Sequence, residues 1–150
     1  MEFDDNFKEF AVETAIFANR SLIEIEKGTK GQEGLRKSLE KMGEKQADKI
    51  SDDLHNTLLE YRESIVKIDD HNGKIFIRNY EKDPEIICEK YGKFVKKYES
   101  ELDKIKPLVM TKINPVARSS FLNLENMFMT YKQNATKKIE NMSKESIAYA

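Results

Sequence analysis

"PVARSSFLNLENMFMTYKQNATKKIENMSKESIAYA" runs from Pro115 to Ala150 and decides the fold class. Apolar or small residues recur in it at intervals of three and four, which places them on one face of an α-helix. This stripe consists of Ala117, Phe121, Leu124, Phe128, Tyr131, Ala135, Ile139, Met142, Ser146 and Tyr149. Its spacing approaches that of a coiled coil. Asn114 and Pro115 supply a helix cap and a first-turn proline, so we predict a helix over 115–148.

Three earlier segments carry the same helical period. We predict these helices over 4–27, 33–71 and 84–106. In the first segment, Val12, Ile16 and Ile23 widen a stripe that phenylalanines begin. Gly43 lowers the helix preference inside the second, where we expect a bend. Pro107 should end or kink the third helix, because proline lacks the backbone N–H that a helix interior needs.

The stretch "DDHNGKIFIRNYEKDP", from Asp69 to Pro84, joins the second and third predicted helices. Asn72 and Gly73 form a turn signal, since both tolerate positive φ. The three residues at 75–77 are β-branched or aromatic and could be extended. A sheet needs partner strands, and we find no other segment that alternates with period two. We therefore predict a connector over one end of the bundle and no sheet.

Composition agrees with long helices whose outer faces are solvated. Apolar residues make up 39% of the 150 residues and charged residues 35%, with three prolines and six glycines. Narrow apolar stripes need fewer apolar residues than a sheet sandwich does. The joints are mostly short, which favours antiparallel neighbours. We predict one all-α domain over 1–150, an elongated antiparallel four-helix bundle with coiled-coil-like packing.

The predicted helices differ in length, so part of the apolar stripe in the last helix should stay uncovered. A second copy of the chain could cover it, which makes a homodimer an expected assembly. Cys88 is the only cysteine and the start "MEFDDNFKEF" is acidic, which is not the pattern of a signal peptide. No segment approaches the roughly 20 apolar residues of a transmembrane helix. We expect a cytoplasmic protein.

Catalytic and cofactor motifs do not stand out from chance matches. Gly28, Gly31 and Gly34 form G-x-x-G-x-x-G, but no strand precedes them as a phosphate-binding loop requires, so a flexible linker is expected. Cys88 near a helix start has no histidine placed by sequence to act as its base. We find no paired carboxylates. The expectation is a protein that is not an enzyme and needs no cofactor.

A metal- or ligand-binding bundle is a further alternative, because His55 and His71 sit in the similar phrases "DDLH" and "DDH". The two histidines are 16 residues apart, or about 24 Å along a straight helix, so they cannot share one ion within a chain. The Glu-x-x-His pattern of di-metal bundles is absent. Such a site would use His55, His71 and nearby aspartates with residues of another helix or subunit.

The first alternative to a protein-interaction module is a surface for anionic membranes. Residues 1–72 have a net charge of −6 and residues 73–150 a net charge of +5. The basic residues concerned are Lys93, Lys96, Lys97, Lys137 and Lys138. Long kinked helices, with Pro107 inside one, resemble BAR domains in architecture. That resemblance implies a curved helical dimer that binds anionic membranes through these lysines.

The function that the sequence favours is a non-catalytic protein-interaction module, such as an adaptor, scaffold or assembly subunit. Tyr131, Ile139, Met142 and Tyr149 are the expected partner-binding residues, because they extend past what a short first helix can cover. Self-association is the expected form of binding. Nucleic acid is a less suitable partner, since acidic residues interrupt the basic cluster and the aromatic residues fall on the core stripe.

Overall fold

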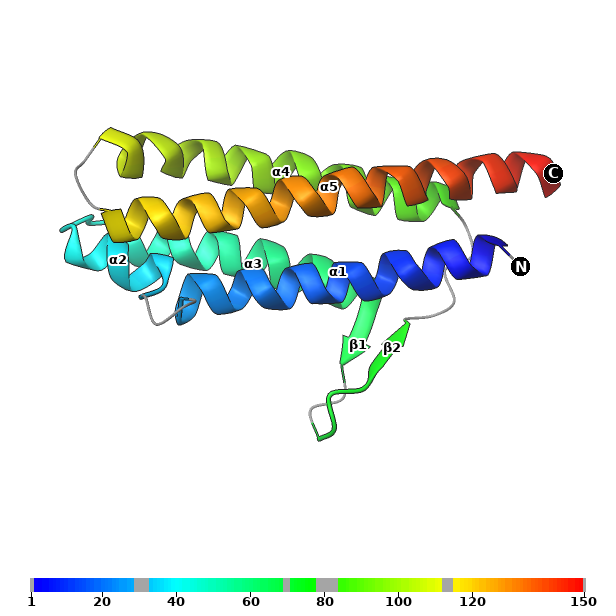
Figure 1. Ribbon diagram of the computed structural model, residues 1–150, viewed down its shortest axis with the longest axis horizontal. Helices are drawn as coiled ribbons and strands as arrows, with labels where there is room; N and C mark the ends of the chain where they lie inside the picture. Colours follow the sequence, from blue (N-terminus) through cyan, green and yellow to red (C-terminus); the bar gives the residue numbers. More distant parts are fainter. Residues whose placement is uncertain (1, 29–32, 69–70, 78–83, 112–114, 150) are drawn as a thin grey trace.

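A computed structural model describes residues 2–28, 33–68, 71–77, 84–111 and 115–149. Helices make up most of this part of the chain (Figure 1). They are α1 (Glu2–Glu26), α2 (Leu35–Lys41), α3 (Ala47–Ile65), α4 (Pro84–Thr111) and α5 (Pro115–Tyr149). Two short strands, β1 (Val66–Ile68) and β2 (Ile75–Ile77), lie between α3 and α4. The all-α prediction is confirmed, with five helices packed as a compact bundle.

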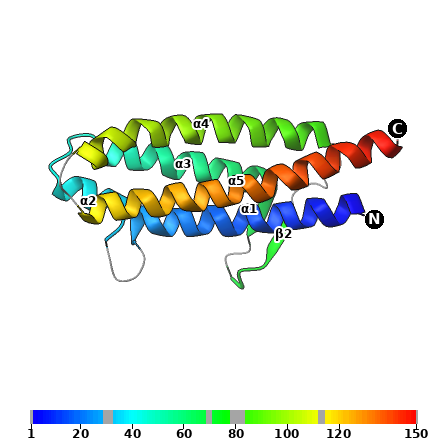
Figure 2. The ribbon, with the colours of Figure 1, turned by 45° about the horizontal axis from the view of Figure 1, so that its top comes forward.

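The helices α1 and α5 form the most extensive contact in the bundle, although they are the first and last elements of the chain. They lie side by side and run in opposite directions (Figures 1 and 2). α5 also packs on α4, α4 on α3, and α3 on α1, which closes a ring around the core. α2 is short and lies at the end of the bundle where α1 ends (Figure 1).

Aromatic rings fill the middle of the core. The Tyr61 and Phe94 rings stack with centroids 4.0 Å apart, which joins α3 to α4. The Phe17 and Tyr131 rings stack at 4.4 Å and join α1 to α5. Phe17 also meets the edge of Tyr98, whose side chain is fully buried. Such pairs contribute about 0.5–1.5 kcal/mol each beyond the area that they bury.

A chain of hydroxyl hydrogen bonds crosses this aromatic core. Thr14 Oγ1 donates to the Phe10 carbonyl oxygen at 2.8 Å and lies 2.7 Å from Tyr131 Oη. Tyr131 Oη lies 2.5 Å from Tyr61 Oη. Because the Thr14 proton is used by Phe10, Tyr131 must donate to Thr14, and Tyr61 then donates to Tyr131. The chain runs from α3 through α5 to α1.

The prediction of one helix over 33–71 is wrong, because Gly43 ends α2 rather than bending it. Gly43 adopts φ of 77°, which L side chains rarely adopt. The Glu44 N–H donates to the Leu39 carbonyl at 3.1 Å, and the Gly43 N–H donates to the Glu40 carbonyl at 3.0 Å. These two bonds are those of a Schellman motif. A new helix, α3, begins at Ala47.

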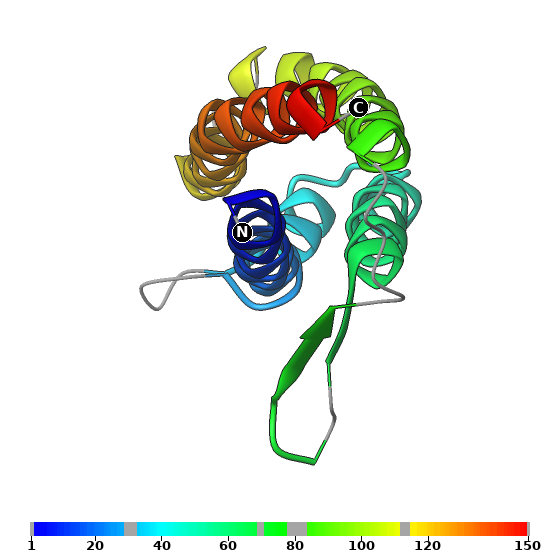
Figure 3. The ribbon, with the colours of Figure 1, turned by 90° about the vertical axis from the view of Figure 1, so that its right-hand side faces the viewer.

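The prediction of no sheet is also wrong. β1 and β2 pair as an antiparallel hairpin, with Val66 opposite Ile77 and Ile68 opposite Ile75. Gly73 takes φ of 71° in the turn between them. α3 therefore ends at Ile65, six residues before the predicted end, because the strand ladder replaces the helical hydrogen bonds. The hairpin projects from the bundle (Figure 3).

The remaining helix bounds lie close to those expected, with one difference at Pro107. Helices expected over 4–27 and 115–148 lie at Glu2–Glu26 and Pro115–Tyr149. The helix expected to end at 106 continues through Pro107 to Thr111. Its buried residue Val109, which is 0% exposed, explains the extension: one more turn of α4 contributes to the core.

Arg36 and Gly34 hold the short helix α2 in place. The Arg36 guanidinium lies 2.9 Å from Glu26 of α1 and 2.7 Å from Asp52 of α3. The hydrogen bond from Arg36 lowers the pKa of Glu26. Gly34 packs directly against the end of α1, since a Cβ there would lie 2.6 Å from the Ile25 carbonyl oxygen. This close contact gives Gly34 a packing role that the linker interpretation did not foresee.

Candidate functional site

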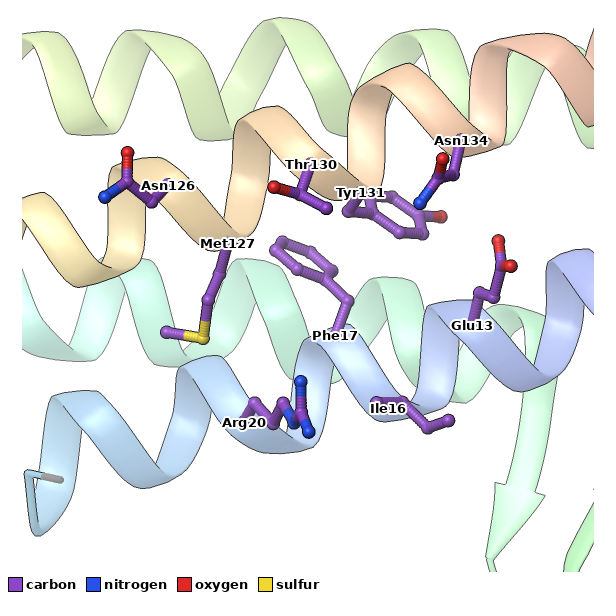
Figure 4. Close-up of a pocket in the computed structure, with 9 residues that line it drawn as sticks. All are labelled: Glu13, Ile16, Phe17, Arg20, Asn126, Met127, Thr130, Tyr131 and Asn134. Carbon is purple, nitrogen blue, oxygen red and sulfur yellow. The ribbon is translucent and has the colours of Figure 1, made fainter. Parts of the chain in front are cut away.

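A groove lies between α1 and α5 on the part of the surface that the structure describes (Figure 4). Its volume is about 330 Å³. The stacked rings of Phe17 and Tyr131 lie between the two helices, with Ile16 and Met127 beside them. Polar side chains complete the lining: Glu13, Arg20, Asn126, Thr130 and Asn134. The groove therefore combines an apolar interior with a polar rim.

Exposed apolar side chains continue the groove along α1. Val12, Ile16 and Ile23 are 41%, 46% and 49% exposed. Among the side chains that the structure describes, α4 and α5 each expose two large apolar residues and α1 exposes three. They recur at intervals of four and seven, so they share one face of α1. Ile16 also lines the groove, so this exposed apolar face adjoins it, and exposed apolar faces of this kind mark interaction sites.

One end of the groove carries a cross-helix ion pair. Lys138 of α5 lies 3.1 Å from Glu13 and 3.7 Å from Glu9 of α1. The Lys138 side chain is only 17% exposed, whereas Glu9 remains 65% exposed. The pair holds α5 against α1 and leaves a negative edge near the start of α1. Arg20, which is exposed, makes the other end of the groove positive.

Of the partner-binding residues expected from the sequence, the three whose side chains the structure describes do not form an exposed surface. Tyr131 and Met142 are 4% and 0% exposed, so the expectation that α1 would leave them uncovered is wrong. α1 reaches far enough along α5 for its Thr14 to contact Tyr131. Ile139 is partly buried against the core. The side chain of Tyr149 lies outside what the structure describes.

Val12, Ile16 and Ile23 were expected to widen the core stripe of α1, and their exposure shows that this prediction is wrong. An available signal was the angular position of these residues. At about 100° per residue they lie about 140° to 180° from the centre of the phenylalanine stripe. Apolar residues on the opposite face of a helix indicate a second contact surface rather than a wider core.

The basic residues proposed for an anionic surface lie on different sides of the bundle. Lys93 and Lys97 line a depression of about 230 Å³ between α3 and α4. Each has a glutamate near its Nζ, at 2.9 and 4.0 Å. Lys138 instead faces α1, across the bundle from that depression. Lys96 and Lys137 are exposed. The geometry does not bring the five lysines onto one face.

The histidines are also separated. His55 of α3 lies with its Nδ1 3.3 Å from Glu26, whereas His71 lies in the exposed hairpin turn. Asp52, three residues before His55, is engaged by Arg36. Among the described residues, no group of three histidine, cysteine, aspartate or glutamate side chains is placed to hold a metal ion. Residues 69 and 70, the aspartates before His71, lie outside the described part.

Comparison with known proteins does not assign a family. No protein-family model, no curated protein and no solved structure matches the chain. Across the described residues, no helix is both long and apolar enough to cross a membrane. The function must therefore be inferred from the groove and its surroundings.

Proposed function

We propose that the protein is a non-catalytic interaction module that binds a protein partner through the groove between α1 and α5. The observation that carries this proposal is the exposure of Val12, Ile16 and Ile23 beside a groove with an aromatic interior. Apolar side chains exposed on one helix face are stabilised when a partner covers them. An amphipathic helix of the partner suits the groove. Its apolar side chains would lie three, four or seven residues apart, which matches the intervals of four and seven between the exposed apolar side chains on α1.

The finer architecture belongs to the same proposal. The long helices would act as an antiparallel four-helix frame with coiled-coil-like packing, and α2 would cover one end of it. Such a frame keeps the spacing between α1 and α5 constant through the Lys138 ion pairs and the Thr14–Tyr131 hydrogen bond. A preformed groove binds with little loss of conformational entropy.

The test compares two arginine substitutions of exposed apolar residues. Ile16→Arg places a charge in the groove, whereas Met129→Arg changes an equally exposed residue (50%) on the side of α5 that faces α4. Quantitative mass spectrometry of proteins captured from native extract should identify a protein that Ile16→Arg loses and Met129→Arg retains. That protein should then bind the purified wild type and not purified Ile16→Arg. Equal capture by all three forms would refute the groove as the binding site.

A further inference from the structure

The outward face of α1, together with the residue directly after it, carries a charge gradient. Seven of its exposed positions are spaced 4, 3, 4, 4, 3 and 4 residues apart, and we call them the α1 stripe. They are Asp5, Glu9, Val12, Ile16, Arg20, Ile23 and Lys27. Lys8 and Glu26 are exposed beside the stripe. The start of the stripe is acidic, the middle is apolar, and the end is basic. All seven lie within a narrow sector opposite the phenylalanines of the core.

The charges at the two ends of the stripe, Asp5 and Lys27, are complementary only when two copies run antiparallel. If a second α1 lies antiparallel over the first, with Ile16 facing its own copy, Asp5 faces Lys27 of the second copy. In that register Glu9 faces Ile23 of the second copy. Val12 then faces Arg20 of the second copy, whose aliphatic stem can cover it. A parallel arrangement would instead place Asp5 on Asp5 and Lys27 on Lys27, which is repulsive. In a two-fold symmetric interface each such contact occurs twice.

The rim of the groove on α5 has a matching symmetry. Asn126 and Asn134 lie four residues on either side of Thr130, which lines the groove with Ile16. An antiparallel copy would bring Asn126 opposite Asn134, and asparagine amides can both donate and accept hydrogen bonds. The α1 stripe and the α5 rim thus favour the same two-fold axis.

We propose that the partner in the groove is a second copy of this chain, whose α1 lies antiparallel to the first across a two-fold axis at Ile16. This inference rests on the proposed function and names its partner. The stripe is about 33 Å long, from 22 residues at about 1.5 Å each. The stripe contains only three large apolar side chains, Val12, Ile16 and Ile23, so the apolar contact is small and the dimer is weak. We expect a dissociation constant of roughly 10–100 µM.

Sedimentation equilibrium of the purified protein from 1 µM to 1 mM, a range chosen to bracket the expected dissociation constant, measures this assembly. Wild type should pass from monomer to dimer. Ile16→Arg should raise the dimer dissociation constant at least about 30-fold, because it places two arginines at the two-fold axis. Met129→Arg should change that constant by no more than about twofold. Circular dichroism checks that both variants remain folded. If the wild type stays monomeric at 1 mM, the partner is not a second copy of the chain. The proposed binding of a protein partner would then still be tested by the capture experiment with Ile16→Arg and Met129→Arg in native extract.

Charge exchange tests the direction of the two helices. Asp5→Lys or Lys27→Asp alone should weaken the dimer about fivefold, because each creates two like-charge contacts. Asp5→Lys and Lys27→Asp in one chain should restore the wild-type constant within about twofold. A double variant that is weaker than either single variant would refute the antiparallel arrangement.

Cross-linking locates the axis independently of affinity. In a Cys88→Ser background, Ile16→Cys should form a disulfide-linked dimer when diamide is added as oxidant. Val12→Cys should not form this disulfide. Val12 faces Arg20 of the second copy, so the two introduced cysteines would be eight residues apart, or about 12 Å along the helix at about 1.5 Å per residue. A mixture of Asp5→Cys and Lys27→Cys chains should form the mixed dimer, and neither chain alone should do so. A dimer that links through Val12→Cys instead would overturn the proposed register while leaving self-association intact.

Discussion

Replacing Tyr131 by phenylalanine should destabilise the bundle more than replacing Tyr61, although the two hydroxyls contact each other. Tyr131→Phe removes both the bond to Thr14 and the acceptor for Tyr61. The Tyr61 hydroxyl would then be buried without a partner, because the residue is only 5% exposed. Thr14 loses little, since it still donates to the Phe10 carbonyl.

The magnitudes follow from these losses. A net hydrogen bond contributes about 1 kcal/mol, and an unsatisfied buried hydroxyl costs about 1–3 kcal/mol, so Tyr131→Phe should cost about 2–3 kcal/mol. Tyr61→Phe removes only the last donor of the chain and should cost about 1 kcal/mol. The rings remain, so the stacking of residue 131 on Phe17 is kept. For a chain of this length, Tyr131→Phe should lower Tm by about 5–10 °C.

Urea unfolding followed by circular dichroism at pH 7 measures both variants and the double variant. The double variant should be more stable than Tyr131→Phe alone, because Tyr61→Phe also removes the hydroxyl that was left without a partner. A double variant less stable than Tyr131→Phe, or a cost for Tyr61→Phe that exceeds that for Tyr131→Phe, would refute the direction assigned to the hydrogen-bond chain.

Four further outcomes are expected in unfolding experiments. Gly34→Ala should cost about 2–3 kcal/mol, because its Cβ would overlap the α1 carbonyls; a cost under 0.5 kcal/mol would contradict this close contact. Gly43→Ala should cost about 1–2 kcal/mol through its positive φ alone, since nothing lies within 4 Å of a Cβ there, and Gly43→Asn should cost less. The hydrogen bond from Arg36 lowers the pKa of Glu26, so the stability contributed by ionised Glu26 is present at neutral pH and is lost as pH falls below about 4. Arg36→Ala should make the free energy of unfolding depend less on pH in this range, as measured by urea titrations from about pH 3 to 7. Burial raises the pKa of Tyr98, so the stability that this residue contributes should be constant below about pH 10 and fall above it, and Tyr98→Phe should reduce that alkaline loss.

Several structural features could be predicted from local residue patterns. The helix at Pro115–Tyr149 was identified because one face carries apolar residues at a constant period and a cap precedes it. The β-hairpin was missed because Ile65 and Ile68 continue the helical stripe, while Val66 and Ile68 fit a strand of period two equally well. A strand of three residues carries too little pattern to separate these alternatives. Pairing with Ile75, seven residues away across the turn, decided between them.

The candidate site was less accessible to sequence analysis. Tyr131 belongs to the most regular stripe in the chain and is buried, whereas Ile16 looked like core and is 46% exposed. Both residues are apolar in character and lie on amphipathic helices, so hydropathy alone does not separate them. The two residues are distinguished by their positions relative to neighbouring helices.

By itself, the sequence determined that the chain is helical and where most helices begin or end, because apolar period, caps, prolines and glycines act within a few residues. Only the tertiary structure decided which apolar faces are covered. α5 is covered by α1 along Thr14 and Tyr131, while the outer face of α1 has no described element over Ile16. Burial depends on which distant segment packs on each face, and the spacing of residues along one helix does not contain that information.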